Sequence, residues 1–304
     1  MNIFLKPRAG LFFLILLARM YSSGAEQFYF NIEDKINTSR HIDWREEEIL
    51  LRKKLYVSAF KDSLRDTLDV PKILSLRDIS QCQFEGVEEK LTFEVKWGFV
   101  SAGYGVLSVS PGQNPDCIEL TGMAVTHRFL GALYRVKDYS RCEIDTDGFY
   151  PLFFEEHIRE GRYRSNRWRV YDHVGGKVHA SNSKHCSDSV PPFVQTYLSA
   201  FYYFRTVPWD VGDTVFVNSF VQGKTYPMYF ACIERDTIDI EGAEFPCIRV
   251  RPHLKEKAMV FGAGDRVDIW LTDDKYRLPV FVKAKILFGA IKCSLVYGKR
   301  VKIK

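Results

Sequence analysis

Residues 94–105 read EVKWGFVSAGYG and place three glycines within eight positions, at Gly98, Gly103 and Gly105. A phosphate-binding P-loop has the pattern GxxxxGK followed by Ser or Thr. Gly98 and Gly103 have its glycine spacing, but Tyr104 and Gly105 stand where lysine and Ser or Thr are needed. A dinucleotide fingerprint needs a helix after its glycines, whereas residues 106–110, VLSVS, alternate as a strand does. The glycines therefore predict a tight reversal, a bulge or a barrel corner between two strands.

Other stretches of the sequence alternate between apolar and polar residues, as half-buried strands do. They are residues 91–97 (LTFEVKW), 214–221 (TVFVNSFV), 265–271 (DRVDIWL) and 280–286 (VFVKAKI). Turn signals occur at 175–176, 222–223, 241–242 and 272–274. Strands joined by such turns predict a mainly β fold, an antiparallel meander that forms a barrel-like or open-barrel sheet.

Two stretches follow helical spacing instead. Residues 43–60 (DWREEEILLRKKLYVSAF) begin with Asp43, and Glu46 three positions later completes the pattern of a capping box. Residues 188–209 (DSVPPFVQTYLSAFYYFRTVPW) repeat apolar side chains at helical spacing, with Pro191 and Pro192 suited to a first turn and Pro208 to a stop. We expect one N-terminal helix and one mid-chain helix, over about 192–205, that divides the strands into an earlier and a later set.

The N-terminus has the order of a secretory signal peptide. Two basic residues, Lys6 and Arg8, precede an apolar run at 11–18, and small residues follow it, so we place the cleavage after Ala25. The run is far shorter than the roughly 20 residues of a membrane-spanning helix. We expect an exported protein of the periplasm or cell envelope of a Gram-negative bacterium, with no transmembrane span after cleavage. No cysteine stands near the cleavage position, which argues against a lipid anchor.

Charge and cysteine content exclude further classes. Cleavage lowers the formal net charge from +5 by removing Lys6, Arg8 and Arg19, so the mature chain is nearly neutral and offers no electrostatic case for nucleic acid. The seven cysteines are spread singly, without a CxxC pair. Buried thiols that act as small hydrophobic side chains are favoured over a disulfide framework, because a hydrophobic core of this size can stabilise the fold without disulfide bonds. The pairing itself stays open, and an odd number leaves at least one thiol free or paired between chains.

Four stretches together resemble a known family. They are LTFEVKWGFVSAGYGVLSV (91–109), SAFYYFRTVPWDVGDTV (199–215), GAEFPCIRVRP (242–252) and VDIWLTDDKYRLPVFVKAKILFGAIKCSL (267–295). Over about residues 85–297 the chain is similar to the bacterial exported family catalogued as domain of unknown function 3108. The resemblance implies an exported, mostly antiparallel β protein and brings no catalytic residues. The chain then divides into a signal peptide (1–25), an N-terminal helical extension (26–84) and an antiparallel β domain (85–304).

Two stretches have the residue types of metal sites but not their spacing. Asp145 and Asp147 are spaced as in an EF-hand loop, but the closing position, counted from Glu143, holds Phe154. Residues 173–186 contain His173, His179, His185 and Cys186 without the HxxxH spacing of two ligands on one helix face. We interpret the first as a turn and the second as an exposed hairpin and loop. We expect no metal and no cofactor.

Candidate binding residues come from one unusual stretch. Residues 153–172 read FFEEHIREGRYRSNRWRVYD, and a loop at 160–161 would pair Phe153 with Trp168 and His157 with Arg164. The stretch is either a solvated hairpin or a polar barrel lining, where arginine beside aromatic rings suits sugars or anionic head groups. In the second case Arg164, Arg167 and Trp168 bind ligand, and Trp270 is a further candidate.

Arg205 ends an otherwise apolar helix. We interpret it as a structural tether with a buried partner, because an unpaired buried charge costs several kcal/mol. Anchoring of an anionic ligand is the alternative, and Arg205 is therefore also a candidate binding residue.

Two functions remain. The first is a non-catalytic cell-envelope protein that binds an amphiphile, a glycan or a protein partner in or on its β domain, the partners being a lipid, a glycan or another envelope protein. The second is an envelope hydrolase whose site is assembled from distant residues. The first is favoured, because no GxSxG elbow occurs and the adjacent Asp273 and Asp274 would point to opposite faces of a strand.

Overall fold

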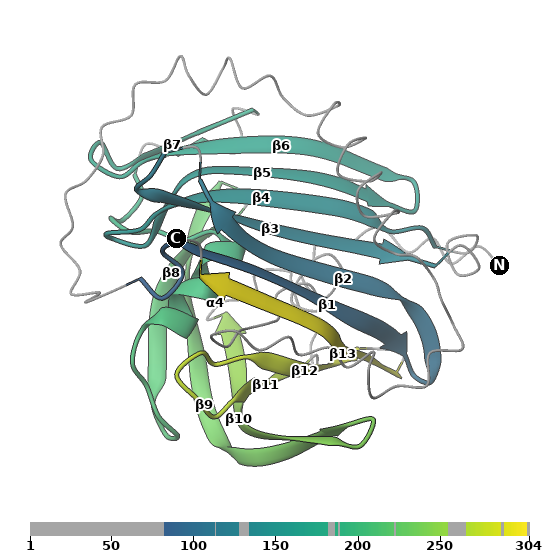
Figure 1. Cartoon of the computed structure of the whole chain (residues 1–304). Helices are drawn as coiled ribbons and strands as arrows, with labels where there is room; N and C mark the ends of the chain where they lie inside the picture. Colours follow the sequence, from purple (N-terminus) through teal and green to yellow (C-terminus); the bar gives the residue numbers. More distant parts are fainter. Residues whose placement is uncertain are drawn as a thin grey trace.

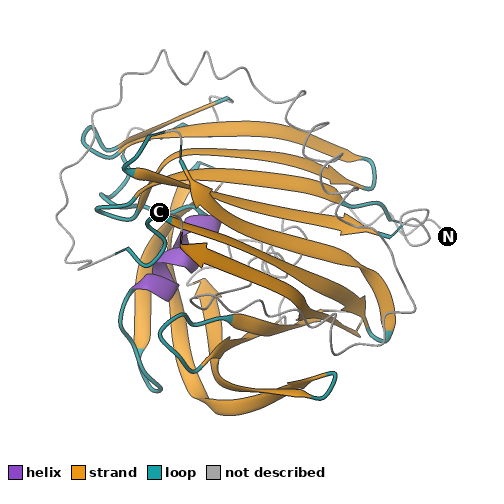
Figure 2. Cartoon of the chain, in the orientation of Figure 1, coloured by secondary structure: helices purple, strands orange, loops and turns teal. Residues whose placement is uncertain are grey.

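The computed structural model describes residues 82–112, 114–127, 134–181, 186–187, 189–221, 223–254, 266–286 and 289–302. The expected signal peptide and N-terminal helix lie outside the described residues. Thirteen strands and one helix make up the described part of the chain (Figures 1 and 2). The elements are β1 (Val87–Trp97), β2 (Val100–Pro111), β3 (Cys117–Thr126), β4 (Lys137–Asp145), β5 (Tyr150–Glu160), β6 (Tyr163–Asp172), β7 (Lys177–Ala180), α4 (Tyr197–Thr206), β8 (Thr214–Val221), β9 (Lys224–Ile240), β10 (Ala243–Leu254), β11 (Arg266–Thr272), β12 (Pro279–Ile286) and β13 (Gly289–Lys302).

All thirteen strands form one antiparallel sheet in the order β7-β6-β5-β4-β3-β2-β1-β13-β12-β11-β10-β9-β8. Strands that follow each other in the chain pair with each other, except β7 and β8, and β1 joins the earlier set to the later set by pairing with β13. The predicted antiparallel meander is confirmed. The sheet is not closed, because β7 and β8 remain as its two edges.

The glycines of the opening stretch have the structural role that the sequence predicts. Gly98 has φ +62° in a two-residue reversal between β1 and β2, a conformation that glycine adopts without a Cβ penalty. At Gly103 a Cβ atom would lie 2.0 Å from the carbonyl oxygen of Val125 on β3. Val95 pairs with Gly103 and Lys96 with Ser101, so the residue between them on β2 forms a bulge. The cluster therefore turns a hairpin and admits a close neighbouring strand.

Helix α4 begins five residues later than the sequence predicts. Phe193 has φ +57°, and the backbone of Gln195 pairs with β8, where Gln195 N donates to the Asn218 carbonyl at 2.7 Å. The helix starts only after this pairing, with Thr196 and Ser199 forming a reciprocal capping box at 2.9 Å in both directions. Residues 192–193 thus form a turn and Gln195 forms a single bridge to β8, where the sequence predicts the first helical turn.

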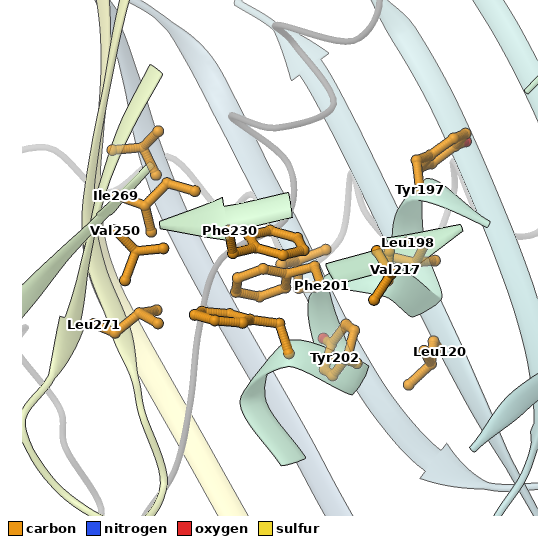
Figure 3. Packing of buried hydrophobic residues seen from close by; sticks show 14 of the residues in the cluster. Leu120, Tyr197, Leu198, Phe201, Tyr202, Val217, Phe230, Val250, Ile269 and Leu271 are labelled. Carbon is orange, nitrogen blue, oxygen red and sulfur yellow. The ribbon is translucent and has the colours of Figure 1, made fainter. Parts of the chain in front are cut away.

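The sheet curls around α4, which fills the interior (Figures 1 and 2). Phe201 and Leu198 of α4 lie between Leu120 of β3 on one side and the β10–β11 side chains Val250 and Leu271 on the other (Figure 3). Both halves of the sheet therefore bury their apolar faces in one core. In the described part of the chain, no helix has the length and apolar character needed to cross a bilayer.

The cysteines contribute to this core as thiols. All seven are free, and all except the exposed Cys186 are buried. Burial raises the pKa of Cys82 to about 11 and that of Cys247 to about 12, because it disfavours the thiolate. The interpretation of these residues as small buried hydrophobes is confirmed for the six buried thiols.

Candidate functional site

The hairpin of β5 and β6 contains the stretch from which sequence reasoning took most of its binding residues. Its loop is Gly161–Arg162, one residue later than predicted, because Glu160 still pairs with Tyr163 and bridges to Val136. Glu155 therefore faces Trp168, and His157 faces Asn166 instead of Arg164. A one-residue move of the loop shifts the register by two, so each side chain stays on its predicted face but meets a different partner.

The hairpin is not the solvated tip that its charge suggests. Four ionisable residues of β5 are at most 3% exposed: Glu155, Glu156, His157 and Glu160. Because successive side chains of a strand point to opposite faces, these residues fall into two clusters, one on each face of the sheet. Buried charges need partners, and both clusters supply them.

The first cluster, here called the Arg141 cluster, lies on the face of the sheet opposite to α4. Arg141 of β4 donates from Nε to Glu155 Oε1 at 2.9 Å and from Nη1 to Glu119 Oε2 at 3.3 Å. His157 bonds through Nδ1 to Asn166 Oδ1 at 3.0 Å, and its Nε2 lies 3.9 Å from Glu155 Oε2. Two carboxylates flank one guanidinium here, so the Arg141 cluster has no excess positive charge for an anionic ligand.

The second cluster, here called the Glu156 cluster, lies on the face that packs on α4. Arg169 of β6 donates from Nη2 to Glu156 Oε1 at 3.1 Å, and Arg167 Nη1 lies 3.8 Å from the same oxygen. The hydroxyl of Tyr197 at the start of α4 donates to Glu156 Oε2 at 3.4 Å. Arg167 also donates from Nη2 to the hydroxyl of Tyr163 at 2.8 Å. Two guanidinium groups thus share one carboxylate.

Aromatic rings surround the Glu156 cluster. The Arg169 guanidinium lies 5.4 Å from the centroid of the Phe154 ring, which in turn meets Tyr197 edge-on at 5.1 Å. Burial is the largest single effect and lowers the pKa of Arg169, but the charge of Glu156, the hydrogen bond to it, and the neighbouring Tyr171 and Tyr197 together raise the pKa above its usual value. Arg169 therefore stays a cation in its buried place.

Among the residues that the structure describes, two other carboxylates also hold two arginines, and both do so more tightly. Fully buried Glu89 accepts from Arg205 at 2.8 and 3.0 Å and from Arg300 at 3.0 Å. Asp268 lies 2.7 Å from both Arg251 and Arg266. In the Glu156 cluster the distances are 3.1 and 3.8 Å, and Arg167 is 23% exposed. Among these three groups, only the Glu156 cluster keeps a loosely held guanidinium near the surface.

The predicted binding residues do not come together in one place. Arg167 is in the Glu156 cluster, whereas Trp168 is half-buried on the other face of β6. Arg164 is exposed and donates to the carbonyls of Gly161 and Tyr163. Arg205 is buried in the network of Glu89, as expected for a tether. Trp270 lies on β11 in the later set of strands and donates from Nε1 to Asp236 at 2.8 Å.

Glu156 and Arg169 were not predicted as site residues, although both lie in the stretch 153–172. The signal was present in the register. With the loop at 161–162, Glu156 faces Arg167 directly, and an opposite-charge cross-strand pair is a recognisable unit of sheet stabilisation. In the predicted register, with the loop at 160–161, Glu156 faces Ser165, so the Glu156–Arg167 pair does not arise. Tyr197 fitted the helical repeat, so nothing distinguished it from a core residue.

The metal-like stretches have structural roles. Asp145 Oδ1 accepts from the backbone N–H groups of Asp147 and Gly148, which makes the predicted turn. His173 is buried, not exposed as expected, and its Nε2 lies 2.7 Å from the Pro151 carbonyl oxygen. Across the described ranges, no three His, Cys, Asp or Glu side chains are grouped as a metal site.

One serine–histidine pair occurs outside these clusters. Ser101 Oγ lies 3.3 Å from His127 Nε2 at the end of β2. A nucleophilic serine needs such a base, and the base in turn needs an orienting group. Within the described residues, no carboxylate bonds to the His127 ring, so the pair lacks the third member of a triad.

The fold defines an open, antiparallel β protein with one interior helix. Residues 92–296, well over half of the chain, match the family described as protein of unknown function DUF3108. The chain belongs to this family, and the resemblance found in the sequence is confirmed.

The chain is similar to a β-barrel-like protein of the domain of unknown function DUF1849 from Brucella abortus, with 9% sequence identity and a TM-score of 0.47. The similarity covers 70% of this chain and 97% of that chain. No curated protein matches this chain.

Proposed function

We propose that this protein is a non-catalytic, exported cell-envelope protein that binds an amphiphile with an anionic head group at the Glu156 cluster. Export rests on the signal-peptide pattern of the N-terminus. The binding role rests on one observation: two arginines share a single carboxylate, and the half-buried Arg167 is 3.8 Å from it. Within the described chain, no second carboxylate forms an ion pair with either arginine.

The chemistry of the cluster supports an anionic group as the ligand. A guanidinium offers several N–H donors in a plane that matches carboxylate and phosphate oxygens. Arg167 and Arg169 together carry one positive charge more than Glu156 neutralises. The rings of Phe154, Tyr163 and Tyr197 beside them provide apolar surface with hydroxyl groups at its edge. An anionic head group with an apolar body satisfies both kinds of surface.

The proposal can be tested on protein that is purified from its own cell envelope. Native mass spectrometry of the wild-type chain is expected to show an added mass, and lipid extraction then identifies it. Arg167→Gln is expected to reduce the retained ligand about tenfold, the effect of losing one charge-assisted contact of about 1.4 kcal/mol. The folded protein should otherwise keep its melting temperature, because Arg167 is partly exposed and weakly paired.

Arg251→Gln is the matched control. Arg251 is 22% exposed, against 23% for Arg167, and it also shares its carboxylate with a second arginine. Its substitution is expected to leave the retained ligand unchanged. Equal loss from both variants, or a wild-type chain without added mass, contradicts the proposal.

A further inference from the structure

The hairpins β1–β2, β3–β4 and β5–β6 turn at one end of the earlier strands, on the right-hand side of Figure 1. Of the β3–β4 connection, the structure describes residue 127 and residues 134–136. Backbone hydrogen bonds link their neighbouring residues in turn. His127 N donates to the Ala102 carbonyl at 2.9 Å, Thr126 N to the Val136 carbonyl at 3.1 Å, and Gly161 N to the Arg135 carbonyl at 2.7 Å. The described residues at these strand ends therefore lie along one end of the sheet, here called the hairpin end.

The hairpin end exposes most of the large apolar side chains that the described chain leaves in solvent. Phe99 is 97% exposed at the tip of the β1–β2 reversal, and Trp97 and Val100 beside it are 51% and 44% exposed. Tyr134, next to the β5–β6 loop, is 37% exposed. Exposed apolar side chains that gather in one region mark a contact surface.

Exposed charge at this end is mainly positive. Arg135, Arg162 and Arg164 are exposed around the β5–β6 loop, whereas the nearby carboxylates Asp138 and Glu160 are buried. Lys96 pairs with Glu94 at 2.9 Å and adds no net charge. The connections at the opposite end of the same strands differ, because their described residues expose Asp116 and Asp147. One exposed apolar side chain, Val174, lies at that acidic end.

We propose that the hairpin end docks on the surface of an anionic lipid bilayer, with Phe99 and Trp97 inserted among the head groups. A two-residue hairpin tip is narrow, so it offers little area to a protein surface but can enter the interfacial layer of a membrane. Tryptophan is enriched in that layer because its ring is apolar and its N–H is polar. Membrane binding grows with buried apolar area and with attraction between basic residues and anionic lipids, and this end supplies both.

Flotation with vesicles tests the proposal on protein purified from the envelope, after the expected cleavage of the N-terminal apolar run. Vesicles of equal parts phosphatidylglycerol and phosphatidylcholine are expected to carry the wild-type protein upward, and pure phosphatidylcholine vesicles to carry much less. Phe99→Ser is expected to weaken binding about tenfold, the effect of losing one buried aromatic side chain. Arg162→Gln with Arg164→Gln is expected to weaken binding to anionic vesicles by a similar factor. Raising the ionic strength from about 0.1 M to about 1 M should release the protein, because the screening length falls to about 3 Å.

Matched variants distinguish binding through the hairpin end from non-specific binding to vesicles. Phe216 is 71% exposed on β8, and Phe216→Ser is expected to bind vesicles as the wild type does. Lys177→Gln with Lys275→Gln removes two positive charges from exposed places outside the hairpin end and is also expected to change nothing.

The outcomes are distinguishable from those of the ligand proposal, because vesicle binding and retained ligand are measured separately. Wild-type protein that stays at the bottom of the gradient, or Phe99→Ser protein that floats fully, overturns the docking surface. Equal binding to neutral and anionic vesicles overturns the role of the arginines. Wild-type protein that forms a dimer in solution, lost on Phe99→Ser, assigns the patch to a protein contact and also overturns the proposal.

Discussion

Glu89 shows how this protein uses buried charge at the scale of a residue. The carboxylate lies on β1, accepts both Nη atoms of Arg205 from α4, and also accepts from Arg300 on β13. The Arg205 guanidinium lies 4.8 Å from the ring centroid of Phe84 and 5.2 Å from that of Tyr202. Every charge in this network has a partner, and the network ties the interior helix to the strands that join the two halves of the sheet.

Substitution of Arg205 should lower stability strongly. Arg205→Ala leaves Glu89 buried with only Arg300 as its partner, and breaking such a pair costs roughly 3–5 kcal/mol. Urea unfolding followed by circular dichroism measures the change. Arg235→Ala is the control, because Arg235 bridges Asp210 and Asp273 with a side chain that is 57% exposed. Screening by solvent keeps the expected effect of this substitution on stability small. If Arg205→Ala kept the melting point of the wild type and lost only ligand, Arg205 would be an anchor and not a tether.

At the scale of the element, hairpin geometry decides which side chains meet. The β1–β2 reversal was predictable, because glycine is the residue that tolerates both its positive φ and the close approach of β3. The β5–β6 loop was harder, because Glu160-Gly161 and Gly161-Arg162 are both acceptable two-residue loops in the sequence. Glu160 is held in β5 by its bridge to Val136, a residue outside the hairpin. A contact of that kind cannot be read from the hairpin's own residues.

Gly103 tests the close approach of β2 and β3. A Cβ atom there would lie 2.0 Å from the Val125 carbonyl oxygen, so Gly103→Ala must push two paired strands apart. We expect a loss of roughly 1–3 kcal/mol, the usual scale for local backbone strain. Thermal unfolding checks it, and Gly242→Ala is a comparison that tests positive φ alone, since a Cβ at Gly242 meets no atom within 4 Å. ATP should shift neither melting curve. A higher melting temperature in the presence of nucleotide would instead support phosphate binding by the glycines.

At the scale of the whole molecule, alternation and turn signals predicted the antiparallel meander, while the approach of its two edge strands depends on contacts that have no local pattern. β7 and β8 are not hydrogen bonded to each other. Tyr171 of β6 nevertheless meets Phe220 of β8 with ring centroids 6.2 Å apart. Gln195 pairs through its backbone with β8 and donates from Nε2 to the Phe149 carbonyl at 2.9 Å. Side chains and one extended residue thus bring together edges that a sequence pattern leaves unassigned.

The two halves of the sheet should unfold together, because α4 provides core to both. Phe201 is fully buried between the β3 side and the β10–β11 side of that core. Phe201→Ala removes contacts from both halves at once and is expected to cost roughly 3–5 kcal/mol. The loss should appear as one shifted transition, with hydrogen exchange accelerated equally in β3–β4 and β9–β11, because a single core unfolds cooperatively. Phe216→Ala, on an exposed side chain of β8, should change stability by about 0.5 kcal/mol or less. A biphasic transition, or faster exchange in only one half, would show instead that β1–β7 and β8–β13 are separate folding units joined only through the β1–β13 pairing.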